Sequence, residues 1–221
     1  MANARLAQMG ALGGIVFVLL QLVSQTMLQA GGSEPKLDAQ SAEIAQFFAD
    51  RDVDLVWTGS FLASLSVIPF TAFVVVISNA LLGAESGANI GSSTAMAFGQ
   101  IVAVIGLIAT LFWSMAIFRV EDGLSPEMSR TLFDLGNFTF ATQWIAIGGF
   151  LLFTGIRSLQ TKVFATWIGW SSVVIALALL PILLDRPDCL RALRPLQDLA
   201  DRNQRDPVHK GSSQRLTRAT I

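Results

Sequence analysis

The chain has 221 residues, of which 52% are hydrophobic and only 14% are charged, and its formal net charge is −1. A soluble domain carries about 25% charged residues, so this composition argues against a soluble globular protein. The single cysteine and single histidine, Cys189 and His209, exclude a disulfide framework and a Cys/His metal site. We expect neither a metal nor a cofactor.

The apolar residues gather in five long runs, which are residues 10–28, 55–82, 95–118, 132–156 and 164–184. Each run is long enough to cross a bilayer as a helix, which needs about 20 residues. None carries the charged stripe of a soluble amphipathic helix, and the short alternating strands of a membrane barrel are not seen. We therefore predict that residues 1–184 form an all-α, polytopic transmembrane helix bundle with about five spans, located in the cell membrane.

The first run contains a polar stripe at three- and four-residue steps. We interpret this run as a retained span and not as a signal peptide, because it continues to Ala30 without the small residue that cleavage prefers. A polar stripe in a span must face protein or water. It lines a polar path, or it forms the interhelical hydrogen bonds that are common in membrane bundles. The stripe consists of Gln21, Ser24, Gln25 and Gln29.

The connection after the first run predicts a short amphipathic helix over residues 38–48. Asp38 or Ser41 is a suitable N-cap for it. Ile44, Phe47 and Phe48 fall on one face of this helix. That face is buried either in the membrane surface or as a lid over the mouth of the bundle, and the pattern fits both.

The later runs show how the spans can pack. Pro69 should bend the second span. The connection over residues 83–94 has the composition of a flexible loop, and the short connection over 157–163 predicts that the helices it joins are antiparallel neighbours. Small residues that allow close approach of helices line the second span (Ser60, Ala63, Ser64), the third (Gly99, Ala103, Gly106, Thr110, Ser114) and the fifth (Gly169, Ser172, Ala176).

Asp134 is the only charged residue inside the five runs, and a charge in a span is a candidate functional site. Ser125 and Pro126 predict an earlier helix start, so the fourth helix is longer than the roughly 30 Å hydrocarbon core. Asp134 is then expected near the headgroups, with Arg130 as its partner one turn earlier. On the same count, Asn137 marks the edge of the hydrocarbon core and Gln143 lies near its centre.

Residues 185–221 differ sharply from the rest of the chain. They contain eight Lys or Arg and five Asp, and we predict a basic, mostly disordered C-terminal tail. With five spans, three basic residues lie on one side of the membrane and eight on the other, which predicts that the tail is cytoplasmic. We expect the bilayer, a second copy or a membrane protein as partners, and no nucleic acid.

Four segments carry a resemblance to known proteins: residues 5–14 (RLAQMGALGG), 43–50 (EIAQFFAD), 132–142 (LFDLGNFTFAT) and 167–170 (WIGW). They resemble bacterial multi-pass membrane proteins that are catalogued only as a domain of unknown function. The resemblance implies a helical membrane fold and brings no activity. Those proteins have a further apolar span near the C-terminus and the N-terminus inside, whereas this chain has a basic tail.

Two functions fit these patterns. The first is passage of a small polar solute or ion along the polar groups, namely the first-span stripe with Asp134, Asn137 and Gln143. The alternative is a non-enzymatic scaffold or regulatory subunit that docks a partner through its small-residue helix faces. We do not expect an enzyme, because no His or Cys lies in any span and Asp134 has no second catalytic group beside it.

Overall fold

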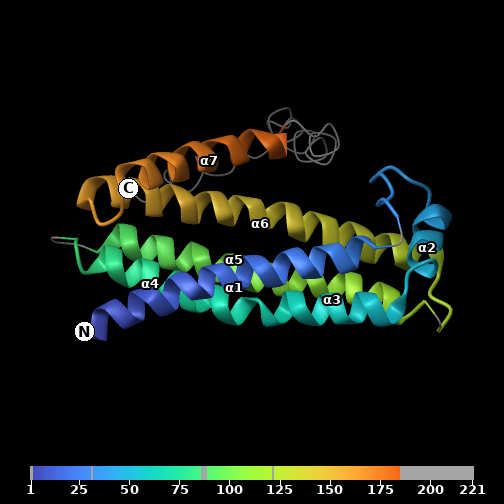
Figure 1. Ribbon diagram of the computed structural model, residues 1–221. Coiled ribbons are helices and arrows are strands. Elements are labelled where there is room, and N and C mark those ends of the chain that lie inside the picture. Colours follow the sequence, from blue (N-terminus) through green and yellow to red (C-terminus); the bar gives the residue numbers. More distant parts are fainter. Residues whose placement is uncertain (1, 31, 86–88, 121, 185–221) are drawn as a thin grey trace, which may run out of the picture. The chain divides into compact units, whose positions relative to one another are not determined.

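The computed structural model describes residues 2–30, 32–85, 89–120 and 122–184, which form seven helices and no strand (Figure 1). The predicted all-α bundle is therefore confirmed. By its internal contacts the chain divides into residues Met1–Pro181 and Ile182–Ile221, and the predicted tail over 185–221 lies outside the described residues. The helices are α1 (Ala2–Gln29), α2 (Ser41–Ala49), α3 (Val53–Leu65), α4 (Val67–Leu82), α5 (Ile90–Phe118), α6 (Pro126–Thr161) and α7 (Thr166–Leu184).

Four segments of the described chain are long and apolar enough to cross a membrane. They are Gly10–Gln29 in α1, Val53–Leu82 across α3 and α4, Ile90–Phe118 in α5 and Pro126–Thr161 in α6. The fifth predicted span corresponds to α7, in which Thr166–Leu179 forms a shorter apolar helix. Length and composition thus indicate a membrane protein, and the number of five spans stays a prediction.

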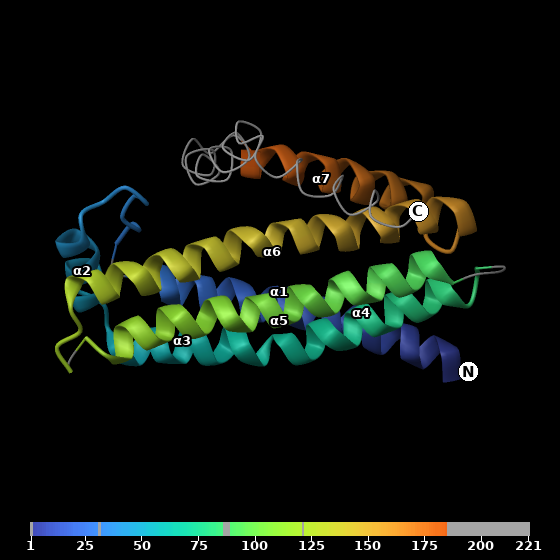
Figure 2. The ribbon, with the colours of Figure 1, turned by 180° about the vertical axis from the view of Figure 1, so that it is seen from behind.

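α1 runs antiparallel along α3 and α4 and approaches them closely through glycines (Figures 1 and 2). A Cβ atom on Gly13 would lie only 2.7 Å from the carbonyl oxygen of Pro69. The Phe17 and Phe70 rings lie beside this contact, with 4.7 Å between their centroids. The backbones of α1 and α4 can lie this close together only because residue 13 has no side chain.

The second span is interrupted at Ser66, where α3 ends and α4 begins. Proline lacks an N–H, and its ring clashes with the carbonyl four residues earlier; for Pro69 that is the carbonyl of Leu65. The Ser66 hydroxyl donates to the Ala63 carbonyl at 2.6 Å. The predicted effect of Pro69 therefore takes the form of a one-residue break in the helix.

α6 packs against α5 and also against α7, and small residues form its contacts with α7. A Cβ on Gly155 of α6 would lie 2.8 Å from the Gly169 carbonyl oxygen of α7, and Gly148 faces Ala176. This order shows that α6 and α7 are antiparallel neighbours, as predicted. A middle core fills the space between α4, α5 and α6; its buried members are Phe70, Val74, Ala95, Val102, Ala103, Ala146 and Phe150.

α6 begins where the sequence predicts. The Ser125 hydroxyl accepts a hydrogen bond from the Met128 amide at 3.3 Å, and Pro126 is the first helical residue. The helix continues to Thr161, through most of the connection expected over residues 157–163, and stops at Lys162, whose φ is 55°. With 36 residues it is about 54 Å long, so it extends well beyond the roughly 30 Å core of a bilayer.

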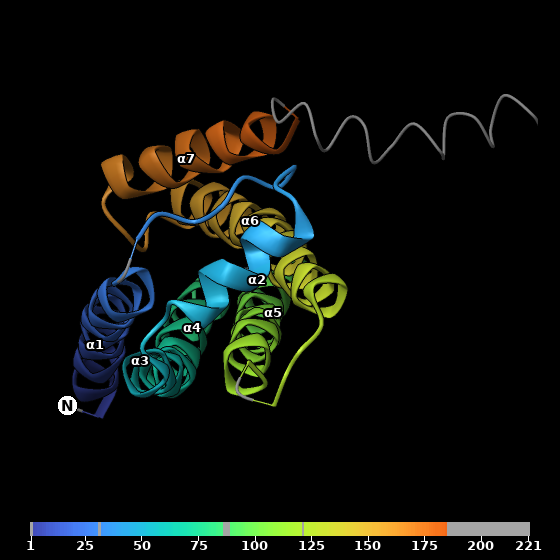
Figure 3. The same cartoon turned by 90° about the vertical axis from the view of Figure 1, so that its right-hand side faces the viewer.

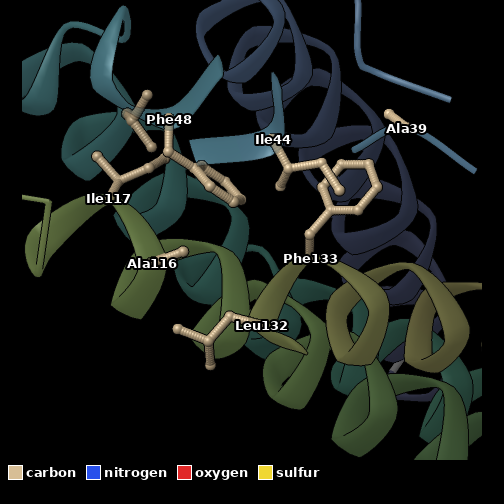
Figure 4. Close-up of a cluster of buried hydrophobic side chains, with 8 residues drawn as sticks. Ala39, Ile44, Phe48, Ala116, Ile117, Leu132 and Phe133 are labelled. Atoms are coloured by element: carbon tan, nitrogen blue, oxygen red, sulfur yellow. The ribbon is translucent and has the colours of Figure 1, made fainter. Parts of the chain in front are cut away.

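The predicted loop helix exists as α2, which forms a lid across one end of the bundle (Figure 3). The expected caps are wrong, because Gln40 is the N-cap residue and makes no side-chain cap hydrogen bond. Ser41 instead lies inside the helix, and Asp38 precedes the cap by two residues. Ile44 and Phe48 are fully buried against residues of α5 and α6 (Figure 4). Of the two interpretations of this apolar face, the lid is therefore the one confirmed.

Candidate functional site

Aromatic side chains anchor the lid to the bundle. The Phe48 ring of α2 lies 5.7 Å from Trp113 of α5 and 6.2 Å from Phe133 of α6, both in edge-to-face arrangements. Phe47 contacts the same two rings, at centroid distances of 5.8 and 6.3 Å. Such pairs stabilise the contact beyond the effect of area burial, so the lid is packed firmly against the bundle.

Arg51 ties the lid to the end of α1. Its Nη1 atom donates to the carbonyls of Leu28 at 3.1 Å and Ala30 at 2.6 Å, and its Nη2 atom donates to the Gly32 carbonyl at 2.9 Å. The last carbonyls of a helix have no intrahelical partner, and the helix dipole favours a cation there. The guanidinium also lies 4.2 Å from the centroid of the Phe47 ring.

The Arg51 side chain is a buried cation, since the residue is only 6% exposed. Burial lowers the pKa of Arg51, and the Glu34 carboxylate partly opposes this effect. Arginine nevertheless stays charged at neutral pH. The end of α1 therefore faces a permanent positive charge supplied by the segment between α2 and α3.

Replacing Arg51 by Met should loosen the lid and leave the spans intact. The methionine keeps much of the apolar stem but cannot donate to the three carbonyls, and we expect a loss of about 1 to 2 kcal/mol. Hydrogen exchange measured by mass spectrometry should show faster exchange in α2 and at residues 28–32, with unchanged exchange in α5. Equal exchange of α2 in both proteins would contradict the proposed tie.

A shallow depression of about 660 Å³ lies beside the lid, between the α1–α2 connection and α2. Four carboxylates and one lysine supply its charged groups, so its formal charge is negative. Phe47 is the one aromatic residue among its lining residues, and the same ring contacts the Arg51 guanidinium. The lining residues are Ser33, Glu34, Pro35, Lys36, Asp38, Ala39, Glu43, Gln46, Phe47 and Asp50.

The structure divides the polar stripe of the first span into two parts. Gln21 donates through Nε2 to the Ser66 hydroxyl at 2.8 Å, at the break between α3 and α4. The buried Ser24 hydroxyl donates to the Gly59 carbonyl at 2.8 Å. Gln25 and Gln29 lie on the exposed side of α1. Interhelical hydrogen bonding is therefore confirmed for Gln21 and Ser24 and does not extend to Gln25 and Gln29.

Gln143 lies at a different interface from Gln21. Its Nε2 atom donates to the Val102 carbonyl of α5 at 2.8 Å, and a Cβ on Gly106 would lie 2.6 Å from the same nitrogen. Gln21 contacts the α3–α4 segment, whereas Gln143 lies between α5 and α6. The structure does not bring these two amides together into one polar site.

Gly106 leaves the space through which Gln143 reaches the α5 backbone. Replacing Gly106 by Ala should displace the amide and cost about 1 kcal/mol, which is the usual range for hydrogen bonds between membrane helices. Gln143→Leu should cost a similar amount, and the double variant should cost little more than either alone because both remove the same bond. Additive losses of thermal stability in detergent would show that the two changes act separately.

Asp134 and Asn137 make contacts within α6. The Asp134 Oδ2 atom lies 3.8 Å from the Arg130 Nε atom, and both side chains are about one third or more exposed. The pair predicted from the sequence is thus confirmed. Asn137 donates to the Phe133 carbonyl of its own helix at 3.0 Å. Among the described residues, these contacts do not connect Asp134 or Asn137 to another span.

The sequence did not single out the ion pair between Glu85 and Arg157. The Arg157 Nε and Glu85 Oε1 atoms are 2.9 Å apart, and the Glu85 side chain is only 4% exposed. Gly91 provides the space for the guanidinium, because a Cβ there would overlap it. The signals in the sequence are a lone acid after one span and an arginine at the end of another, and nothing local shows that the two ends are neighbours.

Comparisons of the chain with protein-family models, with curated proteins and with solved structures find no match. The resemblance to bacterial multi-pass membrane proteins therefore stays a prediction. Any functional conclusion must come from the geometry of this chain.

Proposed function

We propose that the protein is a multi-pass protein of the bacterial cell membrane that acts without enzymatic chemistry, as a scaffold or regulatory subunit. Its docking surface is the acidic depression beside the lid, and the segment that docks there is basic. The depression, with four carboxylates against one lysine in a volume of about 660 Å³, is the observation that carries this proposal. Opposite charges favour the encounter and align the partner.

The contacts of the small-residue faces favour a docking surface at the lid and not on the spans. Gly99 packs against Val74, and Gly155 packs against Gly169 and Val173. These glycines were candidates for binding a partner helix, and they are occupied by neighbouring helices of the same chain. The lid, in contrast, combines a fixed position with exposed charged groups.

The distribution of basic residues supports a cytoplasmic position for the lid. Lys36, Arg51, Arg119 and Arg130 all belong to the lid end of the bundle, whereas Arg5, Arg157 and Lys162 belong to the other end. Short loops rich in Lys and Arg remain in the cytoplasm. If α7 also crosses the membrane, the C-terminal tail is cytoplasmic too.

Docking is tested with the purified protein in lipid nanodiscs and a synthetic peptide of alternating lysine and alanine. Neutralising Asp38, Glu43 and Asp50 to their amides should weaken binding about tenfold or more, and added salt should weaken it as well. The matched control neutralises Asp122 and Glu127, which are exposed and belong to the same end of the bundle. Equal weakening by both sets would contradict a site in the depression.

Passage of a small polar solute or ion is the second candidate, and one observation favours it. Gln21 reaches Ser66 at the point where the second span is broken, and breaks in spans expose backbone groups that transporters use for binding. The test is solute uptake in a deletion strain complemented with wild type, Gln25→Leu or Gln143→Leu. Full rescue of an uptake defect by both variants would remove these two glutamines from the path.

A further inference from the structure

α1 contacts the rest of the bundle through one face only. Gly10, Gly13, Phe17 and Ser24 contact α3 and α4, and Figure 3 shows α1 at the edge of the bundle beside these helices. Only 6% of the apolar window of the candidate span in α1 is buried, against 28% for each of the other three candidate spans. Most of the surface of α1 is therefore open to lipid or to another protein.

A second seam with three- and four-residue steps runs along this open surface. By helical geometry it lies about 110° round the helix from the packing face. Its central members are large and apolar, with Ile15 57%, Val18 52% and Leu22 61% exposed. The spacing is that of a helix that pairs with another at a small crossing angle. The exposed seam consists of Gln8, Ala11, Ile15, Val18, Leu22, Gln25 and Gln29.

Gln25 and Gln29 are the polar members of this seam inside the candidate span, and Gln25 lies one turn before the end of α1. Exposed hydroxyls on the spans donate to their own helix, as Thr26 does to the Leu22 carbonyl at 2.7 Å and Thr142 to the Phe138 carbonyl at 2.8 Å. Gln25 has no hydrogen-bond partner among the described residues. An amide exposed to lipid is costly unless another protein group bonds it.

We propose that the exposed seam of α1 binds the same seam of a second copy, and that the two Gln25 side chains form hydrogen bonds across a twofold axis. A carboxamide is self-complementary, because each one donates through its NH₂ group and accepts through its oxygen. Copies inserted in the same orientation have parallel α1 helices, so each seam residue meets its own counterpart at the same depth. A symmetric pair of this kind is the commonest form of oligomer.

Cysteine cross-linking in native membranes tests the position of the seam. In a Cys189→Ser background, Val18→Cys and Leu22→Cys lie on the seam, whereas Val16→Cys and Val23→Cys lie about a third of a turn away and are also exposed. Oxidation should give several-fold more disulfide-linked dimer at the two seam positions than at the two control positions. Equal yields at all four positions, or dimer at the control positions alone, would overturn the proposal.

The role of Gln25 is tested by measuring how the full chain dimerises at increasing dilution in lipid. Energy transfer between labelled copies reports the fraction of dimer. Gln25→Leu should weaken the dimer about 3- to 30-fold, the range expected for hydrogen bonds between membrane helices, and Thr26→Leu should leave it unchanged. Gln25→Asn, which keeps the carboxamide, should retain more affinity than Gln25→Leu. A monomer at every dilution, unchanged affinity in Gln25→Leu, or assembly only with a different protein would overturn it.

Discussion

Replacing Arg157 by Met is expected to destabilise the protein by about 3 kcal/mol. The Glu85 side chain is 4% exposed and its Oε1 atom lies 2.9 Å from the Arg157 Nε atom. Removing the arginine leaves a buried carboxylate without its cation, and such a charge costs far more than the pair contributes. The loss should appear as a lower midpoint of thermal unfolding in detergent at neutral pH.

Two control variants test whether the loss of stability comes from leaving a charged carboxylate buried. Arg119 pairs with Asp122 at 2.8 Å, but these side chains are 57% and 61% exposed, so Arg119→Met should change stability by less than about 1 kcal/mol. Combining Arg157→Met with Glu85→Gln should recover much of the lost stability, because the buried charge is then gone. A double variant as unstable as Arg157→Met alone would show that the arginine acts through packing over Gly91.

Gly13→Ala is expected to cost about 2 kcal/mol, which is typical of overpacking. The added Cβ would lie 2.7 Å from the Pro69 carbonyl oxygen, and a backbone atom cannot rotate away as a flexible side chain can. α1 must then move away from α4 and strain the hydrogen bonds of Gln21 and Ser24. Thermal unfolding and faster hydrogen exchange in α1 both measure this change.

Gly148→Ala provides the matched control. Its Cβ would lie 3.7 Å from the Ala176 carbonyl oxygen, which is ordinary van der Waals contact. Since Ala also favours helix over Gly by about 1 kcal/mol, this variant should be as stable as wild type or more stable. If Gly13→Ala were equally stable, the close approach of α1 to α4 would be wrong.

Local signals in the sequence predict much of this fold. The apolar runs mark the long helices, because a span must be both long and uncharged. Ser125 and Pro126 locate the start of α6, because capping and proline geometry depend on neighbouring residues only. The link between Asp134 and Arg130 is also local, since both lie on one face of one helix. None of these predictions requires knowing which helices are neighbours.

The rest depends on contacts between distant segments. Helical spacing groups Gln21 with Gln25, but only the position of α3 and α4 decides that Gln21 bonds Ser66 while Gln25 stays exposed. Arg51 meets residues about 20 positions earlier, and Glu85, which follows α4, meets Arg157 in α6. The candidate site beside the lid arises in the same way, because the α1–α2 connection folds back onto α2.

The central claim, that the bundle crosses a membrane with the lid on the cytoplasmic side, is tested most directly by cysteine labelling in cells. Single cysteines replace Lys36 beside the lid, Lys162 at the opposite end and Val104 within α5, in a Cys189→Ser background. A membrane-impermeant maleimide should label position 162 in intact cells, position 36 only after the membrane is permeabilised, and position 104 in neither case. Labelling of positions 36 and 162 from the same side, or labelling of position 104 as readily as the ends, would contradict the account.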